Sequence, residues 1–565
     1  MQPRPYDPEP RYPTQPGDVV CGWDAAATSL PGQPFILAVD GPPSVDWKSA
    51  IDQLQTAIGH IEVTTLDIRE HYCAWETFEA RTGSAELVGD PDFAPLATGD
   101  LAQLFDGVPV VDRLADSALV VFGPGAALVT HDVLWYVDLP KRYAEAAVAG
   151  GVGCNLGARP NGREATTRRL FYIDWPLLDR HRDGLLDRVD RWVDARPDRG
   201  ITSIDGATLR ATAETLAGQP FRTRPTFNTT PWGGHWGQRV LAMNTEAPNT
   251  ALGYELIAPE SGVLVGNGPD RDVEIPFGIV VALHPEKVLG AAVHDAFGTS
   301  FPVRFDYLDT IGGDSLSVHC HPQSDYMQRV FGWPYTQHET YYVMETSGDR
   351  SIYLGLRGDV DLETFAAQAH AADHDGIPFA IEDHVQTFPA DRHQLFLIPA
   401  GTPHGSGEGN VVLEVSATPY LYSLRFYDWL RRGADGTQRP VHVEHAFANL
   451  NPERRGTDIA RDLIQSPRPL RDGASWSEEV LGALPEMFFQ VRRLVLAGDE
   501  PLPDDTTSGF HVLTVVEGGG VIVCSGNREH VLSYAETMVV PAAVGTYTLR
   551  RIGAARVRLV KALTR

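Results

Sequence analysis

The chain has 565 residues, of which 43% are hydrophobic and 21% charged, so it has the composition of an ordinary globular protein. A chain of this length exceeds one hydrophobic core, and we expect roughly three or four domains. The formal net charge of −27 favours solubility and argues against nucleic acid or an anionic membrane as a partner.

The five cysteines are scattered and odd in number, so no disulfide framework is expected and a reducing cytoplasm fits best. The N-terminus is rich in proline and lacks the apolar core of a signal peptide. No stretch is long and apolar enough to span a membrane.

Residues 1–34 are expected to form an extended, partly disordered lead-in, because their prolines cannot join helices or central strands. The run Phe-Ile-Leu-Ala-Val-Asp at 35–40 then predicts a buried parallel strand. A turn beginning at Gly41, then Lys48 and Ser49, leads into a helical pattern through Ile51, Leu54 and Ile58.

This order of strand, turn and helix is typical of a phosphate-binding loop, whose backbone amides cradle phosphates at a helix N-terminus. The place directly before Lys48, where such a loop needs glycine, holds Trp47, and Asp46 would set a negative charge against the ligand. We therefore interpret the segment as a degenerate loop and a structural remnant, with nucleotide binding as the alternative.

Further apolar strands begin at Leu119 and Val133, and helices are indicated near residues 141–148 and 175–193. Alternating strands and helices predict a parallel α/β sheet over residues 35–195. The region resembles nucleoside and nucleotide kinases of the phosphate-loop class. Residues 196–224, with a helix at 207–216, are expected to be a linker to an all-β region.

Three separate segments of the all-β region carry potential metal ligands. His319 and His321 alternate along an apolar strand, so both point to the same face. Glu339 opens a second strand, and His404 follows the Pro-Ala-Gly-Thr-Pro turn after a third. Three imidazoles and one carboxylate suit a first-row divalent metal, and the combination is the signature of cupin barrels.

Many motifs in order give residues 225–565 a strong family resemblance. They are Phe-Asn-Thr-Thr-Pro-Trp-Gly-Gly at 227–234, Gly-Tyr-Glu-Leu-Ile at 253–257, Phe-Pro at 301–302, the His-x-His, Glu and His segments above, Leu-Arg-Phe-Tyr-Asp-Trp at 424–429 and Arg-Pro-Val-His-Val-Glu-His-Ala at 439–446. The region looks like class I mannose-6-phosphate isomerase, a zinc-dependent cupin enzyme. The implied architecture is a metal-binding cupin domain at 225–427, a helical and loop insert at 428–485, and a second cupin domain at 486–565.

The second cupin domain is expected to be metal-free, serving as a support or a dimer surface. Val-Pro-Ala at 540–542 echoes Ile-Pro-Ala at 398–400, but Thr546 stands where the counterpart of His404 is expected. His511 falls opposite Glu339, with no His-x-His motif before it.

The resemblance implies an aldose-ketose isomerase in which a metal polarises the substrate oxygens. Its four ligands match His319, His321, Glu339 and His404, although the family usually has glutamine in place of His319. Zinc is the implied metal, with manganese or iron as the alternative because of the extra histidine. Arg425 matches the active-site arginine and would hold an enediolate or carboxylate, unless it pairs structurally with Asp428.

Asp306 and His338 are the candidates for the catalytic base. Two lysines that the family uses for phosphorylated substrates are replaced by Asp306 and Gln337. A phosphate dianion in contact with Asp306 would be repelled by about 1 to 4 kcal/mol. The implied substrate is then an unphosphorylated sugar or another neutral polyol, unless the phosphate is held differently. The other hypotheses are a cupin oxygenase or decarboxylase, and a non-catalytic sugar-binding regulator.

Overall fold

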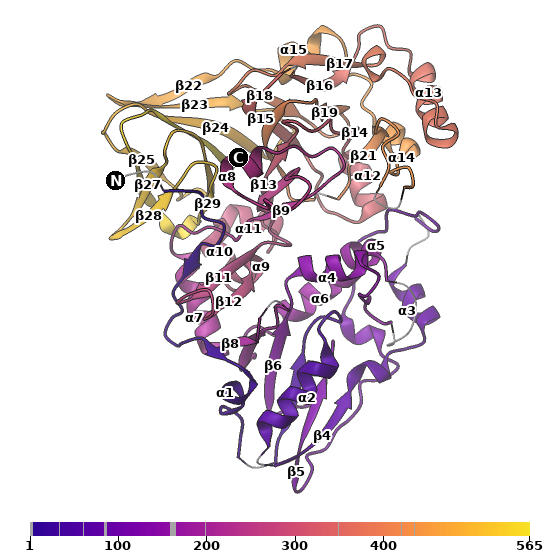
Figure 1. The fold of residues 1–565 in the computed structure, drawn as a ribbon, viewed down its shortest axis with the longest axis vertical. Coiled ribbons are helices and arrows are strands. Elements are labelled where there is room, and N and C mark those ends of the chain that lie inside the picture. The colour runs from indigo at the N-terminus through magenta and orange to yellow at the C-terminus, as the bar shows by residue number, and fades with distance from the viewer. Residues whose placement is uncertain are drawn as a thin grey trace.

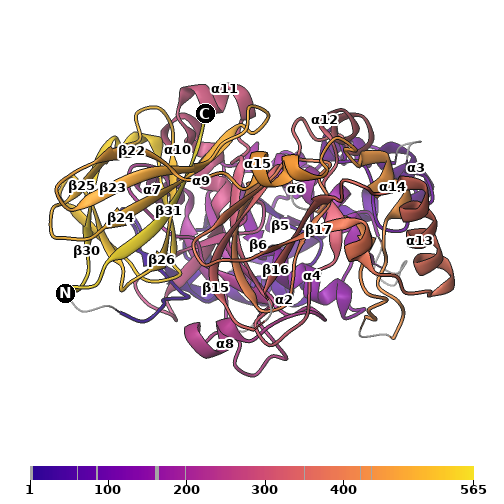
Figure 2. The same cartoon turned by 90° about the horizontal axis from the view of Figure 1, so that it is seen from above.

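The computed structural model describes residues 4–32, 34–59, 61–83, 87–158, 165–197, 199–348, 350–419, 421–433 and 436–565. It is a sheet-rich, mixed α/β, multidomain structure. An α/β domain, indigo to purple in Figure 1, lies below two units built from β-sheets, which Figure 2 shows beside each other. None of the described helices is long and apolar enough to cross a lipid bilayer.

The α/β domain is built on a seven-stranded sheet in the order β2-β8-β7-β6-β3-β5-β4. Its strands are β2 (Val20–Cys21), β3 (Ile36–Asp40), β4 (Glu62–Asp67), β5 (Ser117–Phe122), β6 (Val133–Asp138), β7 (Arg191–Asp194) and β8 (Thr202–Asp205). From β4 to β7 all neighbours are parallel, while β8 and β2 are added antiparallel. All five residues of β3 are buried, as expected for a central parallel strand covered on both faces.

Helices and short helical segments cover this sheet. They are α1 (Trp23–Ala27), α2 (Trp47–Ile58), α3 (Trp75–Thr82), α4 (Lys141–Ala149), α5 (Thr167–Arg169), α6 (Trp175–Asp183), α7 (Gly206–Ala217), the short segments η1 (Ile68–His71), η2 (Leu101–Leu104) and η3 (Ala126–Leu128), and the π-helical η4 (Leu170–Asp174). The predicted helix is confirmed as α2, in which Ile51, Leu54 and Ile58 are all buried. The helix expected at 175–193 is corrected: α6 ends before Gly184, and the apolar pair Trp192 and Val193 belongs to the fifth parallel strand.

Two segments expected to be loosely attached are part of the packed structure. The described residues of the lead-in add β1 (Arg11–Tyr12) in parallel to β11 (Gly262–Gly266), and Arg4 forms an ion pair with Glu536 at 3.0 Å. The expected linker at 196–224 contains β8 and α7, and α7 packs against α9 (Phe277–Leu283). Burial of apolar side chains such as Leu209 and Leu216 explains why this stretch is not a free connector.

The first β unit, here the first sandwich, has a six-stranded sheet, β18-β15-β20-β13-β10-β9, and a five-stranded sheet, β17-β16-β19-β14-β21. Its strands are β9 (Thr226–Asn228), β10 (Leu252–Leu256), β13 (Val303–Asp309), β14 (Val318–Cys320), β15 (Glu339–Thr346), β16 (Ser351–Leu356), β17 (Val385–Pro389), β18 (Leu395–Ile398), β19 (His404–Ser406), β20 (Asn410–Ala417) and β21 (Leu424–Tyr427). Its helices and short segments are α8 (Trp236–Leu241), α9, α10 (Pro285–Leu289), α11 (Ala291–Phe297), α12 (Ser324–Tyr326), η5 (Met327–Phe331), α13 (Leu362–Asp375), η6 (Ile381–Asp383), α14 (Val443–Asn449) and α15 (Thr457–Leu463).

The second sandwich has a six-stranded sheet, β22-β23-β24-β31-β26-β29, and a four-stranded sheet, β25-β30-β27-β28. Its elements are β22 (Arg468–Asp472), β23 (Trp476–Gly482), β24 (Phe489–Leu496), β25 (Leu502–Asp505), β26 (His511–Glu517), β27 (Val521–Ser525), β28 (Arg528–Leu532), β29 (Thr537–Val540), η7 (Ala542–Val544), β30 (Thr546–Arg551) and β31 (Val557–Thr564). Because β22 and β23 hydrogen-bond into this unit, the insert expected at 428–485 is shorter, and the second unit starts before residue 486.

The two sandwiches share one strand order. When β9, β10 and β13 to β20 are counted 1 to 10, the larger sheet reads 8-5-10-3-2-1 and the other contains 7-6-9-4. Counting β22 to β31 in the same way gives the same two series. The chain therefore contains a structural repeat, which makes positions in the two units comparable.

Buried ion pairs hold the α/β domain against the hairpin of β11 and β12 (Asp272–Pro276). Asp272 accepts from Arg11 at 2.7 Å and from Arg196 and Arg199 at 2.6 Å each. Both oxygens of the buried Glu274 accept from Arg142 of α4. Since breaking a buried ion pair leaves an uncompensated charge, these contacts fix how the domain sits on the hairpin of β11 and β12.

Candidate metal centre and cavity

Three histidines converge in the first sandwich, as the sequence indicated. His319 on β14 lies directly opposite His404, the first residue of β19, and His321 follows β14. One nitrogen from each of the three side chains lies within 4.8 Å of the others. The ring centroids of His319 and His404 are 4.3 Å apart, and that of His321 lies 5.0 Å from His404.

The Nδ1 atom of each imidazole faces a backbone carbonyl oxygen. The distances are 2.9 Å from His319 to Ser317, 3.2 Å from His321 to Tyr422 and 2.9 Å from His404 to Thr402. A carbonyl oxygen can only accept, so each Nδ1 donates, and Nε2 is the ring nitrogen that each histidine can offer to a metal. Backbone partners on the far nitrogen are the usual way in which proteins orient metal-binding histidines.

Glu339, the first residue of β15, brings its carboxylate to the same point. Its Oε2 atom lies 2.5 Å from Nε2 of His321 and 3.5 Å from Nε2 of His404. Its Oε1 atom and Nε2 of His404 are buried without a hydrogen-bond partner among the described residues. Buried polar atoms normally have partners, so this orphaned donor set fits a divalent cation held by three imidazoles and one carboxylate.

A cavity of about 460 Å³ opens from the histidines, and Asp306 on β13 lines it. Burial, opposed by Arg304 and reinforced by Glu339, raises the pKa of Asp306 to about 6. Arg304 Nε lies 3.6 Å from this carboxylate, and the same guanidinium pairs with Glu414 of β20. Oδ1 of Asp306 has no hydrogen-bond partner in the described part of the chain, so it can accept from a molecule in the cavity.

Arg425 on β21 lies beside the histidines, because it pairs directly with His319 of β14 in the sheet. Its Nη1 donates to the carbonyl of Pro440 at 3.0 Å. Burial, together with the neighbouring Arg439, lowers the pKa of Arg425 to about 10. The alternative pairing with Asp428 is not observed among the described residues, because Arg431 and Arg439 bind that carboxylate at 2.6 and 2.5 Å.

His338 does not belong to this cavity, which corrects one of the two base candidates. It precedes Glu339, and neighbouring side chains at the start of a strand point to opposite faces. The amide of Ala400 donates to its Nδ1 atom at 3.2 Å, and burial lowers its pKa to about 4. Among the described residues that line the cavity, Gln337 and Glu339 are present and His338 is not.

Several cavity residues were not singled out from the sequence. Arg304, Tyr341 and Glu414 lie on buried strands beside predicted site residues. The sequence signal that could have identified them is a charged or hydroxyl group within an otherwise apolar run. Asp92, Phe93 and Tyr172 come from the α/β domain, and no local pattern in the sequence connects them with the histidines.

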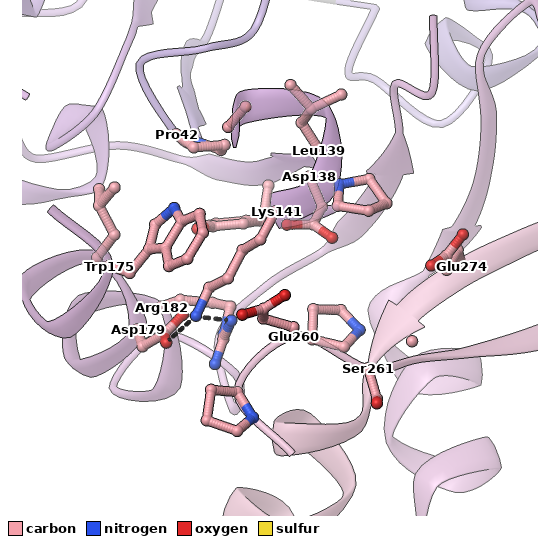
Figure 3. A pocket seen from close by; sticks show the side chains of 17 residues that line it. Pro42, Asp138, Leu139, Lys141, Trp175, Asp179, Arg182, Glu260, Ser261 and Glu274 are labelled. Carbon is pink, nitrogen blue, oxygen red and sulfur yellow. Dashed lines mark hydrogen bonds and ion pairs between the residues drawn. The ribbon is translucent and has the colours of Figure 1, made fainter. Parts of the chain in front are cut away.

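The segment interpreted as a degenerate phosphate loop is closed by its own side chains. The carboxylate of Asp46 accepts from the amide of Ser49 at 3.1 Å and caps α2, and Trp47 is buried. A small cavity nearby is drawn in Figure 3, with Pro42, Asp138 and Trp175 on its wall. Both of the cations among its described lining residues, Lys141 and Arg182, already bind Asp179, at 2.5 and 2.8 Å. Because each already has a carboxylate partner, neither cation is free to bind a phosphate group.

In the second sandwich a buried lysine occupies the equivalent region. His511 pairs with Val540 as Glu339 pairs with Ile398, which confirms the predicted correspondence. Nζ of Lys561 lies 2.7 Å from Glu478 and 2.6 Å from Asp504.

Thr546, which stands where the counterpart of His404 was expected, is exposed. Its neighbour Tyr547 is buried and bonds Nδ1 of His511 at 2.9 Å. The side chains of Lys561, His511 and Tyr547 are therefore partnered by other side chains of the second sandwich.

Comparisons with known proteins found one family model and several similar proteins. A family model described as "Domain of unknown function (DUF8485)" matches residues 22–218. The chain is 25% identical over 255 residues to the probable mannose-6-phosphate isomerase GmuF of Bacillus subtilis (strain 168), covering 45% of this chain and 73% of the relative. It is 24% identical over 326 residues to the mannose-6-phosphate isomerase of Streptococcus mutans serotype c, covering 56% and 90%.

Among solved structures, the mannose 6-phosphate isomerase from Bacillus subtilis aligns with 61% of this chain and 99% of its own, at 18% identity and a TM-score of 0.48. The chain is therefore similar in sequence to mannose-6-phosphate isomerases, and it carries in addition a matched domain of unknown function.

Proposed function

We propose that the protein is a metal-dependent aldose-ketose isomerase of the mannose-6-phosphate isomerase type. The observation that carries the proposal is the convergence of His319, His321 and His404 with the carboxylate of Glu339 beside them. Nε2 of His404 and Oε1 of Glu339 are buried there without a hydrogen-bond partner among the described residues. The similarity to mannose-6-phosphate isomerases supports the same reaction class. Within this proposal both sandwiches are cupin barrels, the first holding the metal and the second serving as a support, and the protein acts in the cytoplasm.

The four side chains would hold zinc, and a bound divalent ion supplies Lewis-acid polarisation of the substrate oxygens. Asp306 is the proposed base: its carboxylate removes a proton from the carbon next to the carbonyl and returns it to the former carbonyl carbon. The hydroxyl proton of the first carbon passes to the oxygen of the former carbonyl. The carbonyl thereby moves by one carbon with no net oxidation. Arg425 donates hydrogen bonds to the oxygen that becomes negatively charged between these two steps.

The α/β domain is proposed to be a phosphate-loop kinase fold whose nucleotide chemistry has been lost. Numbered among themselves, its five parallel strands have the order 2-3-1-4-5, with the degenerate loop after the central strand. The cap by Asp46 and the burial of Trp47 support a structural rather than a nucleotide-binding role for that loop.

The isomerase activity is tested by incubating the zinc-loaded protein with mannose and, separately, with mannose 6-phosphate. Formation of fructose or fructose 6-phosphate, followed by NMR, is expected, with deuterium entering the product in heavy water. A protein that contains stoichiometric metal and converts neither sugar would contradict the proposal.

A second function is favoured by one observation, the presence of a third imidazole in the donor set. Three histidines and one glutamate also suit iron or manganese, the metals of cupin oxygenases and decarboxylases. Metal analysis of the protein as purified separates the two functions when it is combined with an oxygen-uptake assay. Bound iron or manganese with oxygen consumption, and no isomerisation, would favour the second function.

A further inference from the structure

The α/β domain forms part of the wall of the metal cavity. Asp92 and Phe93, in the loop between α3 and η2, line the cavity together with Glu145 of α4 and with Phe171 and Tyr172 of η4. In Figure 1, α5 lies directly below the region of α12 and α14, which places this part of the domain against the first sandwich. The domain is thus placed to act on whatever enters the cavity.

Contacts between aromatic rings attach this wall to the first sandwich. The buried ring of Phe93 lies 4.7 Å from the ring of His442 and is stacked on Tyr422 at 6.2 Å. The ring of Tyr172 lies 5.6 Å from that of Tyr422. The carbonyl of Tyr422 is also the acceptor for Nδ1 of His321, so the wall and the metal centre share one support.

Hydrogen bonds across the same contact hold the loop. The amide of Leu96 donates to the carbonyl of Phe331 at 3.0 Å. Asp90 lies 2.8 Å from Nε2 of His445 on α14, and its other oxygen accepts from the amide of Phe93 at 2.7 Å. Backbone and side-chain bonds on both sides of Phe93 therefore make the wall a fixed part of the cavity.

The wall adds negative charge to a cavity that is already acidic. The carboxylates that line the cavity are Asp92, Glu145, Glu260, Asp306, Glu339 and Glu414, and the guanidinium groups are Arg304, Arg425 and Arg439. Arg304 pairs with Glu414, and Arg439 pairs with Asp428. Of these three described arginines, Arg425 is the one without an ion pair to a carboxylate.

The two acidic residues of the wall face different neighbours. Asp92 lies 3.5 Å from Nε2 of His442, and its side chain is 31% exposed. Burial and the neighbouring Glu260 raise the pKa of Glu145 to about 7. Additional negative charge brought close to either group would be unfavourable.

We propose that the α/β domain sets the substrate class, because Asp92 and Glu145 make the cavity select an uncharged sugar over the corresponding sugar phosphate. This proposal rests on the proposed isomerase function. A neutral sugar donates hydroxyl hydrogen bonds to carboxylates, whereas a phosphate dianion is repelled by them.

The test compares the zinc-loaded unmodified protein with Asp92→Asn, Glu145→Gln and the double variant. Both replacements keep the shape of the side chain and remove its charge. For each protein, kcat/KM is measured for mannose and for mannose 6-phosphate, and the Kd of mannose 6-phosphate is measured by calorimetry. The matched controls are Asp52→Asn and Glu62→Gln, exposed residues of the same domain that do not line the cavity.

The assays are run at pH 8, above the pKa of about 7 of Glu145, so that its carboxylate is charged. Each single variant is expected to raise the preference for mannose 6-phosphate over mannose by about tenfold, equivalent to about 1.4 kcal/mol, with tighter binding of the phosphate. The controls are expected to leave the preference unchanged. Unchanged preference and Kd in variants that keep their metal and melting temperature would overturn the role of the wall. Absence of turnover on both sugars in the unmodified protein would instead overturn the isomerase function and the substrate class together.

Discussion

Nδ1 of His321 lies 3.2 Å from the backbone carbonyl oxygen of Tyr422, and the ring of Tyr422 is contacted by Phe93 from the α/β domain. The orientation of one proposed metal ligand therefore depends on a segment more than 200 residues earlier in the chain. A loop from one domain thus supports a metal centre in another.

His404→Ala is expected to reduce the bound metal by at least about tenfold, because it removes one of three converging imidazoles. Elemental analysis of the purified protein measures this loss directly. His374→Ala on α13 is the matched control, since His374 is exposed and lies outside the cluster. Equal metal content in the two variants would show that the cluster is not the binding site.

Asp306→Asn is expected to lower kcat by about 100-fold to 10,000-fold, the usual effect of losing a general base. Because burial raises the pKa of Asp306 to about 6, the unmodified enzyme should lose activity as the pH falls through 6 and the base becomes protonated. A pH profile of kcat over pH 5 to 8 checks both statements. A fully active Asn variant would remove Asp306 from the mechanism.

His338→Ala is expected to leave kcat within about twofold of the unmodified enzyme, since His338 lies outside the cavity. The lost hydrogen bond from the amide of Ala400 should reduce the free energy of unfolding by about 1 kcal/mol. Denaturant unfolding and steady-state kinetics on the same preparation separate these effects. A loss of activity without a loss of stability would restore His338 as a base candidate.

Glu478→Gln is expected to destabilise the second sandwich by about 3 to 5 kcal/mol at pH 7, because it removes a partner of the buried Lys561. Burial alone would raise the pKa of Glu478, but Lys561 and two arginines lower it to about 2.

A carboxylate with a lowered pKa in the folded state contributes stability above its unfolded value, near 4.3, that is lost as the pH falls toward 2. Unfolding measured from pH 7 to 2 should therefore show a drop in the unmodified protein that is smaller in Glu478→Gln. The control Glu479→Gln removes a partly exposed ion pair with Arg493, and should cost no more than about 1 kcal/mol.

Local patterns were sufficient for much of the site and of the secondary structure. Alternation along a strand placed His319 and His321 on one face, and the apolar spacing of Ile51, Leu54 and Ile58 predicted α2. Such patterns failed for His338, which directly precedes Glu339 in the sequence but does not line the cavity. They also failed for the lead-in, whose prolines were compatible with packing along β11.

The sequence by itself determined the donor types, their alternation on strands and the apolar runs that form the sheets, because these depend on residues close in the chain. The tertiary structure alone decided which distant groups meet. It brought His404 opposite His319, set Arg304 against Glu414 and carried Phe93 to Tyr422. These contacts join residues far apart in the chain, and such pairs are selected by the packing of whole sheets and domains, which leaves no periodic signal in the sequence.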